Sequence, residues 1–357
     1  MRFKVLSATN LRCFEKLNYR PQDEVNLIVG ANGSGKTSVL EALGVASLGK
    51  SFLANRPRDL IRNGQTGMSL SATVQDGDGA VYRLSVNKAA GETRIVFDGQ
   101  PVLAASDLAS RIPVIVINSK VGDILTESPS NRRALIDRTL FHVEHRYIDN
   151  WKNYRLGLRQ RNQLLRSGAA DAEFAYWDNQ LANYAGQIDE KRRALVDVLN
   201  AGLETHELSS ALGQLRWHYA PGWDVEKGML ADLQGSLERD RKAGHTYVGV
   251  HRADLVLKAD EKLVSKRLSR GQSKYLVISM FMALARFITV ARGFKPVVLV
   301  DDLPSELDDK MRARLVDIIQ IDSGQQFYTA IRYADLPEVH DAGGDVFHVE
   351  HARAAAI

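Results

Sequence analysis

Gly30-Ala31-Asn32-Gly33-Ser34-Gly35-Lys36-Thr37 is the stretch that decides the fold of this chain, because it fits G-x-x-x-x-G-K-[ST] at every fixed position. The apolar run before it, residues 25–29, predicts a short buried strand, and residues 37–48 after it have the apolar spacing of a helix. In such a loop the glycines let backbone N–H groups surround phosphates, and the helix N-terminus adds the positive end of its dipole. The sequence therefore predicts a site for a nucleoside triphosphate.

Each position of this loop, called Walker A below, has a predicted part in nucleotide binding. The Lys36 ammonium is expected to reach the β- and γ-phosphates, and the Thr37 hydroxyl is expected to hold Mg²⁺. The predicted nucleotide-binding residues of the loop are Gly30, Ala31, Asn32, Gly33, Ser34, Gly35, Lys36 and Thr37. A glycine-rich loop that merely enters a helix, without a ligand, is the alternative, but the strand–loop–helix setting is the one that the nucleotide motif needs.

A second nucleotide motif follows much later in the chain. Residues 296–300 form an apolar run that ends in Asp301 and Asp302, which is the Walker B pattern. The strand is expected to bring the Asp301 carboxylate beside the Mg²⁺ that Thr37 also holds. Asp302 is then predicted to position the attacking water, so the predicted catalytic residues are Lys36, Asp301 and Asp302, and the predicted metal ligands are Thr37 and Asp301.

Between these motifs lies Leu268-Ser269-Arg270-Gly271-Gln272, at the start of an apolar helix that continues to Arg292. Ser269 and Gln272 have the spacing of a helix N-cap box. The stretch also resembles the L-S-G-G-Q signature of ABC-type ATPases, whose serine and N–H groups bind the γ-phosphate held by a second subunit. On that interpretation Ser269, Gly271 and Gln272 bind nucleotide in trans, and residues 305–308 occupy the D-loop position.

Composition bounds the class of protein. The chain has 357 residues, of which 45% are apolar and 25% are charged, and this suits a globular protein. Its N-terminus alternates as a strand does and does not read as a signal peptide. The apolar run Tyr275 to Ala291 is too short for a membrane span and contains Arg286, so a buried helix is expected. A single cysteine, Cys13, excludes an internal disulfide and favours the cytoplasm.

The net charge of +4 is small, but cations gather in one segment. Residues 132–166 contain nine Lys or Arg and three acids. This predicts a local basic face, with a solvated helix surface as the equal alternative. The cations are Arg132, Arg133, Arg138, Arg146, Lys152, Arg155, Arg159, Arg161 and Arg166.

The order of patterns along the chain predicts an α/β protein of the ABC-type P-loop ATPase class, with a helical lobe inserted into the head. Residues 1–128 are rich in alternating strands and turns, and residues 129–243 show helical periodicity in an antiparallel pair with a third helix. Residues 244–357 return to the head and carry the signature, Walker B and D-loop motifs. The predicted domains are thus an ATPase head, formed by residues 1–128 and 244–357, and an inserted helical lobe, lobe II, formed by residues 129–243.

Several short stretches together resemble the RecF family of ABC/SMC-like ATPases, and the likeness covers nearly the whole chain. Besides Leu268–Gln272 and Asp301-Asp302, the stretches that carry it are Asn10-Leu11-Arg12, Gly49-Lys50-Ser51-Phe52, Ser128-Pro129, Arg132-Arg133, Gly249-Val250-His251-Arg252-Ala253-Asp254 and Ser305-Glu306-Leu307-Asp308.

This resemblance implies a protein that binds ATP and Mg²⁺ and forms an ATP-dependent homodimer on double-stranded or gapped DNA. It implies slow ATP hydrolysis that permits release, partners of the RecR and RecO type, and assistance in loading a recombinase at gaps coated by single-strand-binding protein. Such a protein acts in recombinational DNA repair and replication restart, away from membranes. Arg12 is expected either to reach the nucleotide or to lie on the surface.

The chain departs from the family pattern at several places. Leu53 and Val250 replace an expected Arg and Pro, residues 118–123 replace the expected Q-loop sequence, and Thr329-Ala330-Ile331-Arg332 lacks a switch histidine. Two other functions share the head motifs, an ABC nucleotide-binding subunit of a transporter and a P-loop kinase for a small molecule. The basic helical insertion and the distance between Walker A and the signature argue against the transporter, and the signature has no purpose in a kinase.

Overall fold

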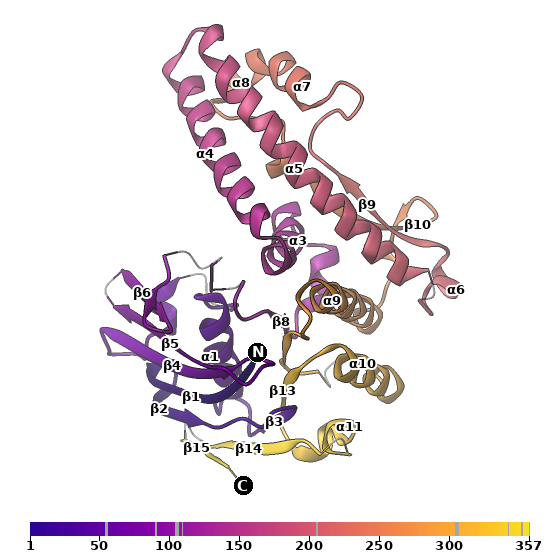
Figure 1. Ribbon diagram of the computed structural model, residues 1–357. Coiled ribbons are helices and arrows are strands. Elements are labelled where there is room, and N and C mark those ends of the chain that lie inside the picture. Colours follow the sequence, from indigo (N-terminus) through magenta and orange to yellow (C-terminus); the bar gives the residue numbers. More distant parts are fainter. Residues whose placement is uncertain are drawn as a thin grey trace. The chain divides into compact units, whose positions relative to one another are not determined.

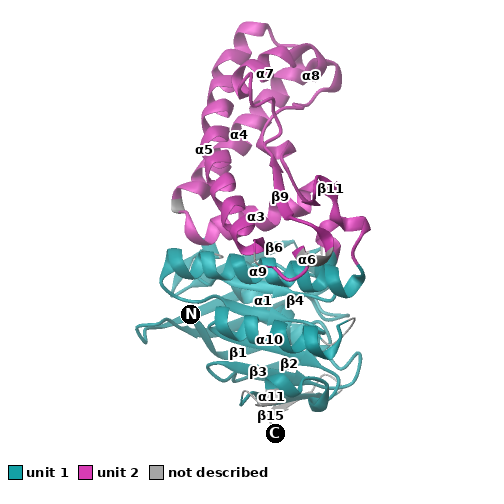
Figure 2. Cartoon of the chain, turned by 90° about the vertical axis from the view of Figure 1, so that its right-hand side faces the viewer, with its two compact units in different colours: residues 1–122, 269–357 teal, residues 123–268 magenta. Residues whose placement is uncertain are grey.

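The structure is a computed structural model that describes residues 1–53, 56–89, 91–103, 107–108, 110–204, 206–303, 307–341, 343–350 and 353–356. The chain divides into two compact units, which Figure 2 shows in different colours. Unit 1 consists of residues 1–122 and 269–357, and unit 2 consists of residues 123–268. Both ends of the chain therefore build one unit, and the other unit is inserted into it in sequence.

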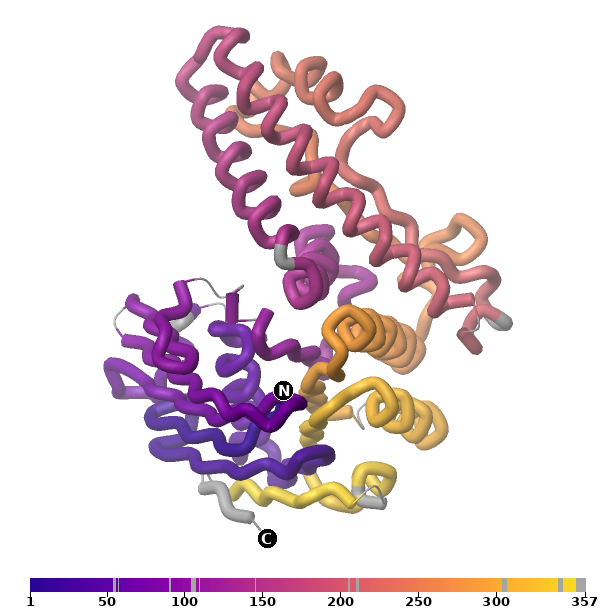
Figure 3. Tube along the Cα trace, in the orientation of Figure 1, coloured from indigo at the N-terminus to yellow at the C-terminus, as the bar shows by residue number. Residues whose placement is uncertain are grey.

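A mixed six-stranded sheet with a parallel core carries the nucleotide motifs in unit 1, in the order β15-β14-β3-β13-β12-β8. All its pairs are parallel except that of β14 with β15. The strands are β3 (Val25–Val29), β8 (Val114–Ile117), β12 (Val297–Val300), β13 (Gln325–Ala330), β14 (Asp345–Glu350) and β15 (Arg353–Ala356). Figure 3 shows the early strand β3 lying among strands from the end of the chain. The strands predicted before Walker A and Walker B are confirmed, and their continuous burial is what a sheet covered on both faces requires.

A second six-stranded sheet in unit 1 is antiparallel, in the order β2-β1-β4-β5-β6-β7. It contains β1 (Arg2–Leu11), β2 (Phe14–Tyr19), β4 (Gly67–Gln75), β5 (Val81–Ala89), β6 (Glu92–Phe97) and β7 (Gln100–Pro101). Alternate residues of β4 and β5 are buried, as the apolar/polar alternation of the sequence predicts. The alternating strands expected among residues 1–128 are confirmed by β4, β5 and β6.

Helix α1 (Lys36–Leu48) packs against strands of both sheets (Figure 1), so it is buried all round from Val39 to its end. This explains why even Glu41 is only 1% exposed. Its carboxylate receives two hydrogen bonds from the Arg12 guanidinium, at 2.6 and 2.7 Å, and a third from the Ser51 hydroxyl. The charge of Glu41 is thereby neutralised inside the core. Gly49 ends the helix in the left-handed conformation, at φ 66°.

Three helices of unit 1 come from the C-terminal part of the chain, α9 (Arg270–Arg292), α10 (Asp309–Asp322) and α11 (Pro337–Asp341). By length and composition α9 could cross a membrane, but 61% of its most apolar window is buried within the protein. That burial agrees with the buried helix expected from its sequence, since a core helix has the same composition.

Unit 2 combines helices with a three-stranded antiparallel sheet in the order β11-β10-β9. Helices α4 and α5 form the expected antiparallel pair (Figure 1), and the single third helix that was expected is two short ones, α7 and α8. The helices are α3 (Pro129–Val143), α4 (His145–Ser167), α5 (Asp171–Leu203), α6 (Ser209–Leu212), α7 (Met229–Gly235) and α8 (Leu237–Ala243). The strands are β9 (Leu215–Ala220), β10 (Asp254–Ala259) and β11 (Lys262–Leu263). Of the short 3-10 helices, η3 (Val250–Arg252) and η4 (Val264–Lys266) lie in unit 2, η1 (Pro57–Leu60) and η5 (Tyr333–Asp335) lie in unit 1, and η2 (Val121–Leu125) crosses the boundary between the two units in sequence.

The end of the inserted unit differs from the boundary predicted at residue 243. Residues 244–268 belong to unit 2, since β10 pairs along its whole length with β9. This pairing joins segments about forty residues apart in sequence and has no local signal, so the sequence alone places the strand with the head. The first boundary, predicted at 128, falls six residues earlier in the structure, after Gly122.

A buried ion network holds unit 2 together. The guanidinium of Arg161, which has no exposed surface, donates to Asp178 and to Asp240, each at 2.7 Å, and to Thr246 at 2.9 Å. These partners come from α5, α8 and the loop after α8. Burial raises the pKa of Asp178, against the effect of Arg161, so the arginine is what makes two buried carboxylates tolerable.

The local basic face predicted from residues 132–166 is wrong in part, because several of its cations are not on the surface. Arg161 lies in the interior, and Arg132 is buried in a bidentate pair with Asp254 at 2.9 Å. Arg133 donates to the Ala253 carbonyl oxygen, and burial lowers the pKa of Arg138. The cations that remain exposed are Arg146, Lys152, Arg155, Arg159 and Arg166. Composition counts charges but does not show which of them fold inward.

Replacing Arg161 by methionine is expected to destabilise the protein by about 3–5 kcal/mol, because it leaves two buried carboxylates without their cation. Thermal and urea unfolding of the full chain measure this. Arg159→Met is the matched control, since Arg159 is exposed on the same helix, and its effect should be within about 0.5 kcal/mol. Equal stability of the two variants would contradict the assigned role of the network.

Candidate nucleotide site

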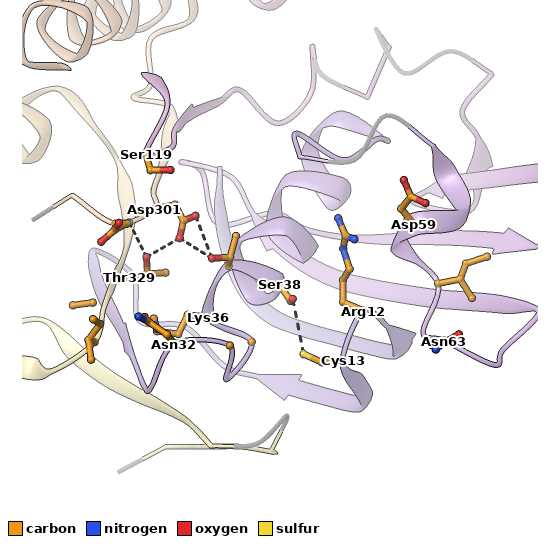
Figure 4. Close-up of a pocket in the computed structure, with 17 residues that line it drawn as sticks. Arg12, Cys13, Asn32, Lys36, Ser38, Asp59, Asn63, Ser119, Asp301 and Thr329 are labelled. Atoms are coloured by element: carbon orange, nitrogen blue, oxygen red, sulfur yellow. Dashed lines mark hydrogen bonds between the residues drawn. The ribbon is translucent and has the colours of Figure 1, made fainter. Parts of the chain in front are cut away.

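A cavity of about 740 Å³ lies at the C-terminal edge of the parallel strands of unit 1. It is lined by Arg12, Cys13, Asn32, Gly33, Gly35, Lys36, Thr37, Ser38, Asp59, Ile61, Asn63, Ser119, Asp301, Asp302, Thr329, Ala330 and Ile331. Figure 4 shows these side chains around the opening. Its volume is within the usual range for small-molecule sites, and its position at the carboxyl ends of parallel strands is where α/β proteins bind ligands.

The Walker A loop connects β3 to α1, as the sequence predicts. Gly33 and Gly35 have φ values of 79° and 118°, which other residues rarely adopt. A Cβ on Gly35 would lie 2.8 Å from the Phe14 ring and 2.9 Å from Cys13 Sγ, so both its conformation and its surroundings require glycine. Glycine is therefore required at position 35 both by the backbone conformation of the loop and by the side chains packed against it.

The groups of this loop fit a phosphate ligand. The Lys36 ammonium donates to the carbonyl oxygens of Gly30 at 2.8 Å and Ala31 at 3.0 Å. Burial lowers the pKa of Lys36, while Asp301 and Asp302 raise it. The Ser34 hydroxyl is buried and has no hydrogen-bond partner among the described residues. A cation held by neutral carbonyls and an unsatisfied hydroxyl are both suited to an anionic ligand.

Thr37 and Asp301 meet although they are 264 residues apart in sequence. The Thr37 hydroxyl lies 3.0 and 3.2 Å from the two carboxylate oxygens of Asp301. Burial raises the pKa of Asp301, and hydrogen bonds from Thr329 and Thr37 oppose that rise. A hydroxyl beside a carboxylate is an oxygen donor set of the kind that Mg²⁺ prefers, so these two residues fit the predicted metal site.

Asp302 follows Asp301 with a left-handed backbone, at φ 56°. Its N–H donates to the Thr329 hydroxyl at 2.9 Å, and its carbonyl oxygen accepts from the buried Lys274 ammonium, also at 2.9 Å. These contacts hold an uncommon conformation in a residue that lines the cavity, and such conformations gather at functional sites. The Asp302 side chain is exposed to the cavity.

Thr329 is a site residue that reasoning from the sequence missed. Its hydroxyl donates to Asp301 Oδ1 at 2.8 Å and accepts from the Asp302 N–H, so it fixes both acids at once. The residue lies in β13, next to the Walker B strand, and in the part of the chain where a switch histidine was expected and not found. The sequence signal was weak, because Thr329 is one of several polar residues in β13, which also contains Gln325 and Gln326.

Thr329→Val keeps the shape of this residue but removes the hydroxyl. We expect ATP hydrolysis to slow about tenfold, since losing a hydrogen bond to a charged group costs about 1.5–3 kcal/mol. Steady-state hydrolysis and ATP affinity should be measured separately. Thr329→Ser, which restores the hydroxyl, should recover most of the rate, and failure of that recovery would contradict the positioning role.

The signature residues lie elsewhere in unit 1. Ser269 caps α9, accepting from the Gln272 N–H at 3.2 Å, while Gln272 Oε1 accepts from the Ser269 N–H at 3.0 Å. Ser269 and Arg270 are exposed. Among the described residues, those that line the cavity do not include Ser269, Gly271 or Gln272. The two D-loop residues Ser305 and Glu306 lie outside the part of the chain that the structure describes.

Arg12 and Ser119 complete the lining. Arg12 lines the cavity and is paired with Glu41, so it belongs to the site wall and is not a free surface residue. Ser119 comes from the segment where a Q-loop was expected, and Figure 4 shows it near Asp301. The departure from the family sequence there does not remove the segment from the site.

A P-loop ATPase head of the ABC/SMC-like class is the class of protein that this fold and site define. The family model described as RecF/RecN/SMC N terminal domain matches residues 2–354. "DNA replication and repair protein RecF" of Cellvibrio japonicus is 37% identical, with 98% of this chain and 97% of that protein covered. The protein of the same name from Shewanella oneidensis is 35% identical, with 99% and 98% covered. The chain therefore belongs to the RecF family.

Solved structures agree with the fold. One described as the recombination mediator protein RecF-ATP in the RecFOR pathway has a TM-score of 0.88 at 23% identity, covering 100% of this chain and 97% of that one. An Smc head bound to the C-winged helix domain of ScpA has a TM-score of 0.56 at 16% identity, covering 100% and 97%. The expected ABC/SMC-like head with a split sequence is thereby confirmed as the fold.

Proposed function

We propose that the protein is an ATP-gated DNA-binding protein of recombinational repair and replication restart in the cytoplasm. ATP drives two copies together on gapped or junction DNA, and slow hydrolysis permits release. The observation that carries this proposal is that the described lining of the nucleotide cavity in a single chain does not include the signature residues. The Walker A and Walker B groups converge on one cavity, while the signature residues lie at the start of α9 and outside the described lining of that cavity, with Ser269 exposed and Gly271 and Gln272 partly exposed.

Within one subunit the residues have separate tasks. Residues 30–36 hold the phosphates of ATP, and Thr37 and Asp301 hold Mg²⁺, which supplies charge neutralisation on the phosphates when bound. Asp302 orients the attacking water, and Thr329 holds both acids in place. Ser269, Gly271 and Gln272 of one copy contact the γ-phosphate bound by the other. Such an arrangement makes dimerisation depend on ATP.

The DNA part of the proposal is supported by unit 2 and by the names of the relatives. On α4 the exposed Lys152, Arg155, Arg159 and Arg166 recur at helical spacing and form one stripe. Cations of this kind neutralise phosphates without reading sequence. The relatives are named for DNA replication and repair, and one solved relative is described within the RecFOR pathway. On that basis we propose RecO- and RecR-type partners and a role in loading a recombinase at coated gaps.

Fluorescence anisotropy with a labelled gapped duplex tests this function, without nucleotide, with ADP and with ATP. We expect tight binding with ATP only, and an affinity that falls steeply with salt, by about 0.9 log units per log unit of salt for each phosphate neutralised. Equal affinity for DNA without nucleotide, with ADP and with ATP would show that DNA binding is not coupled to the nucleotide. That result, together with recovery of the protein in membranes, would favour the transporter subunit.

A further inference from the structure

An exposed tyrosine in unit 2 is surrounded by cations. The Arg239 and Arg252 guanidinium carbons lie 4.7 and 5.0 Å from the centroid of the Tyr247 ring. The His245 ring is 4.4 Å from the same ring, at an interplanar angle of 43°. Arg239 comes from α8, which Figure 1 labels, and Arg252 ends η3. All three side chains of this Arg239–Tyr247–Arg252 cluster are exposed.

The loop that carries the cluster is fixed by hydrogen bonds. The Tyr247 N–H donates to Asp240 Oδ1 at 3.1 Å, and the Thr246 N–H donates to Asn162 Oδ1 at 2.9 Å. The Gly249 N–H donates to the Gly222 carbonyl oxygen at 2.9 Å. Because these partners come from α4, α8 and the loop after β9, the ring of Tyr247 is placed before any ligand arrives.

The buried side of the same loop is held by hydrogen bonds of the His251 ring. Its Nδ1 lies 2.7 Å from the Tyr154 hydroxyl, and its Nε2 lies 3.0 Å from the Thr246 carbonyl oxygen. Burial lowers the pKa of His251 to about 4, so the ring is neutral at pH 7. The Nε2–H then donates to Thr246 and Nδ1 accepts from Tyr154. His251 is thus a structural residue, and its neighbour Arg252 is the residue that faces solvent.

The charges around the cluster are unbalanced. No ion pair joins Arg239 or Arg252 to an acid among the described residues, whereas the nearby acids are already paired. Asp240 pairs with Arg161, Asp254 pairs with Arg132, and Glu238 pairs with Arg241. The positive charge of Arg252 contributes to the lowered pKa values of Arg133 and His251. Excess positive charge therefore remains at the surface.

We propose that Arg239, Tyr247 and Arg252 form a phosphate clamp for the sugar-phosphate backbone of DNA, a contact that rests on the DNA binding proposed above. The ring holds both guanidinium groups within about 10 Å of one another, since each lies about 5 Å from its centroid. Phosphate charges recur every ~3.4 Å along the axis of one strand, so both arginines can reach nearby phosphates of the same strand. Guanidinium forks bind phosphate oxygens in pairs.

The contacts of the Tyr247 ring also indicate that the clamp does not bind DNA by base stacking. The ring of Tyr247 is used to hold the two arginines and His245, which leaves it unsuited as a platform for stacking a base. The clamp is therefore expected to bind duplex and single-stranded backbone without regard to base sequence. The Tyr247 ring contributes because it already restricts both arginine side chains, so each of them loses less conformational entropy when it binds a phosphate.

The test compares variants of the full chain in the gapped-duplex anisotropy assay, with ATP and over a range of salt. Arg239→Gln and Arg252→Gln should each lower the affinity about tenfold near 0.1 M salt and reduce the log–log salt slope by about 0.9. The double variant should reduce the slope by about 1.8. Tyr247→Phe should bind as the original chain does. Tyr247→Ala should bind more weakly although no charge has changed.

Arg216→Gln is the matched control, because Arg216 is exposed in the same unit on β9 and makes the same change in charge. A double variant with an unchanged salt slope would overturn the clamp while leaving the proposed function intact. Equal losses for Arg216→Gln and Arg252→Gln would also overturn it, since charge alone would then account for the effect. If the original chain binds ATP but no DNA at any salt, the proposed DNA function and the clamp both fail.

Discussion

Replacing Lys36 by alanine is expected to lower the affinity for ATP by on the order of 10² or more, corresponding to a loss of about 3 kcal/mol. The ammonium is the cation of the Walker A loop, and burial has already removed part of its water. Without it, the loop keeps its N–H groups but loses the charge that faces the β- and γ-phosphates. ATP-driven dimerisation and DNA binding should be lost with ATP binding.

Isothermal titration with ATP and Mg²⁺ measures the affinity, and light scattering coupled to gel filtration measures the dimer. Lys295→Ala is the control, since Lys295 is exposed just before β12, at the strand end opposite Asp301. It should leave both measurements unchanged. If Lys36→Ala bound ATP as tightly as the original chain, the cavity described here would not be the nucleotide site.

Replacing Asp302 by asparagine should have a different result, with ATP still bound and hydrolysis slowed by about 10²–10⁴. Asparagine keeps the size of the side chain and tolerates the left-handed backbone at this position. It cannot accept a proton from the attacking water as a carboxylate does. The dimer should therefore accumulate with ATP, and DNA should be released slowly.

Single-turnover hydrolysis, ATP affinity and oligomeric state separate these effects. Asp301→Asn should instead weaken Mg²⁺-dependent binding, because Asp301 is the acid in contact with Thr37. Asp309→Asn, an exposed carboxylate in the first turn of α10, is the control for the change in charge. Loss of ATP-driven dimerisation in Asp302→Asn would show that the role assigned to Asp302 is wrong.

The sequence by itself determined the class of fold, the family and the positions of the nucleotide motifs. A loop with left-handed glycines, an apolar strand that ends in acids and a capped helix each require particular residues at fixed spacing. These requirements are local, so Gly33, Gly35, Asp301 and Ser269 could be predicted without coordinates. Helix and strand periodicity gave most elements of both units for the same reason.

Only the tertiary structure decided which distant side chains meet. Thr329 reaches the acids of the neighbouring strand, and Arg161 closes a buried network across unit 2. Arg239 and Arg252 share one tyrosine ring. The pairing of β10 with β9 likewise moved the boundary of the inserted unit. Such contacts depend on strand order, register and helix packing, which bring together segments whose own sequences carry no signal of their partners.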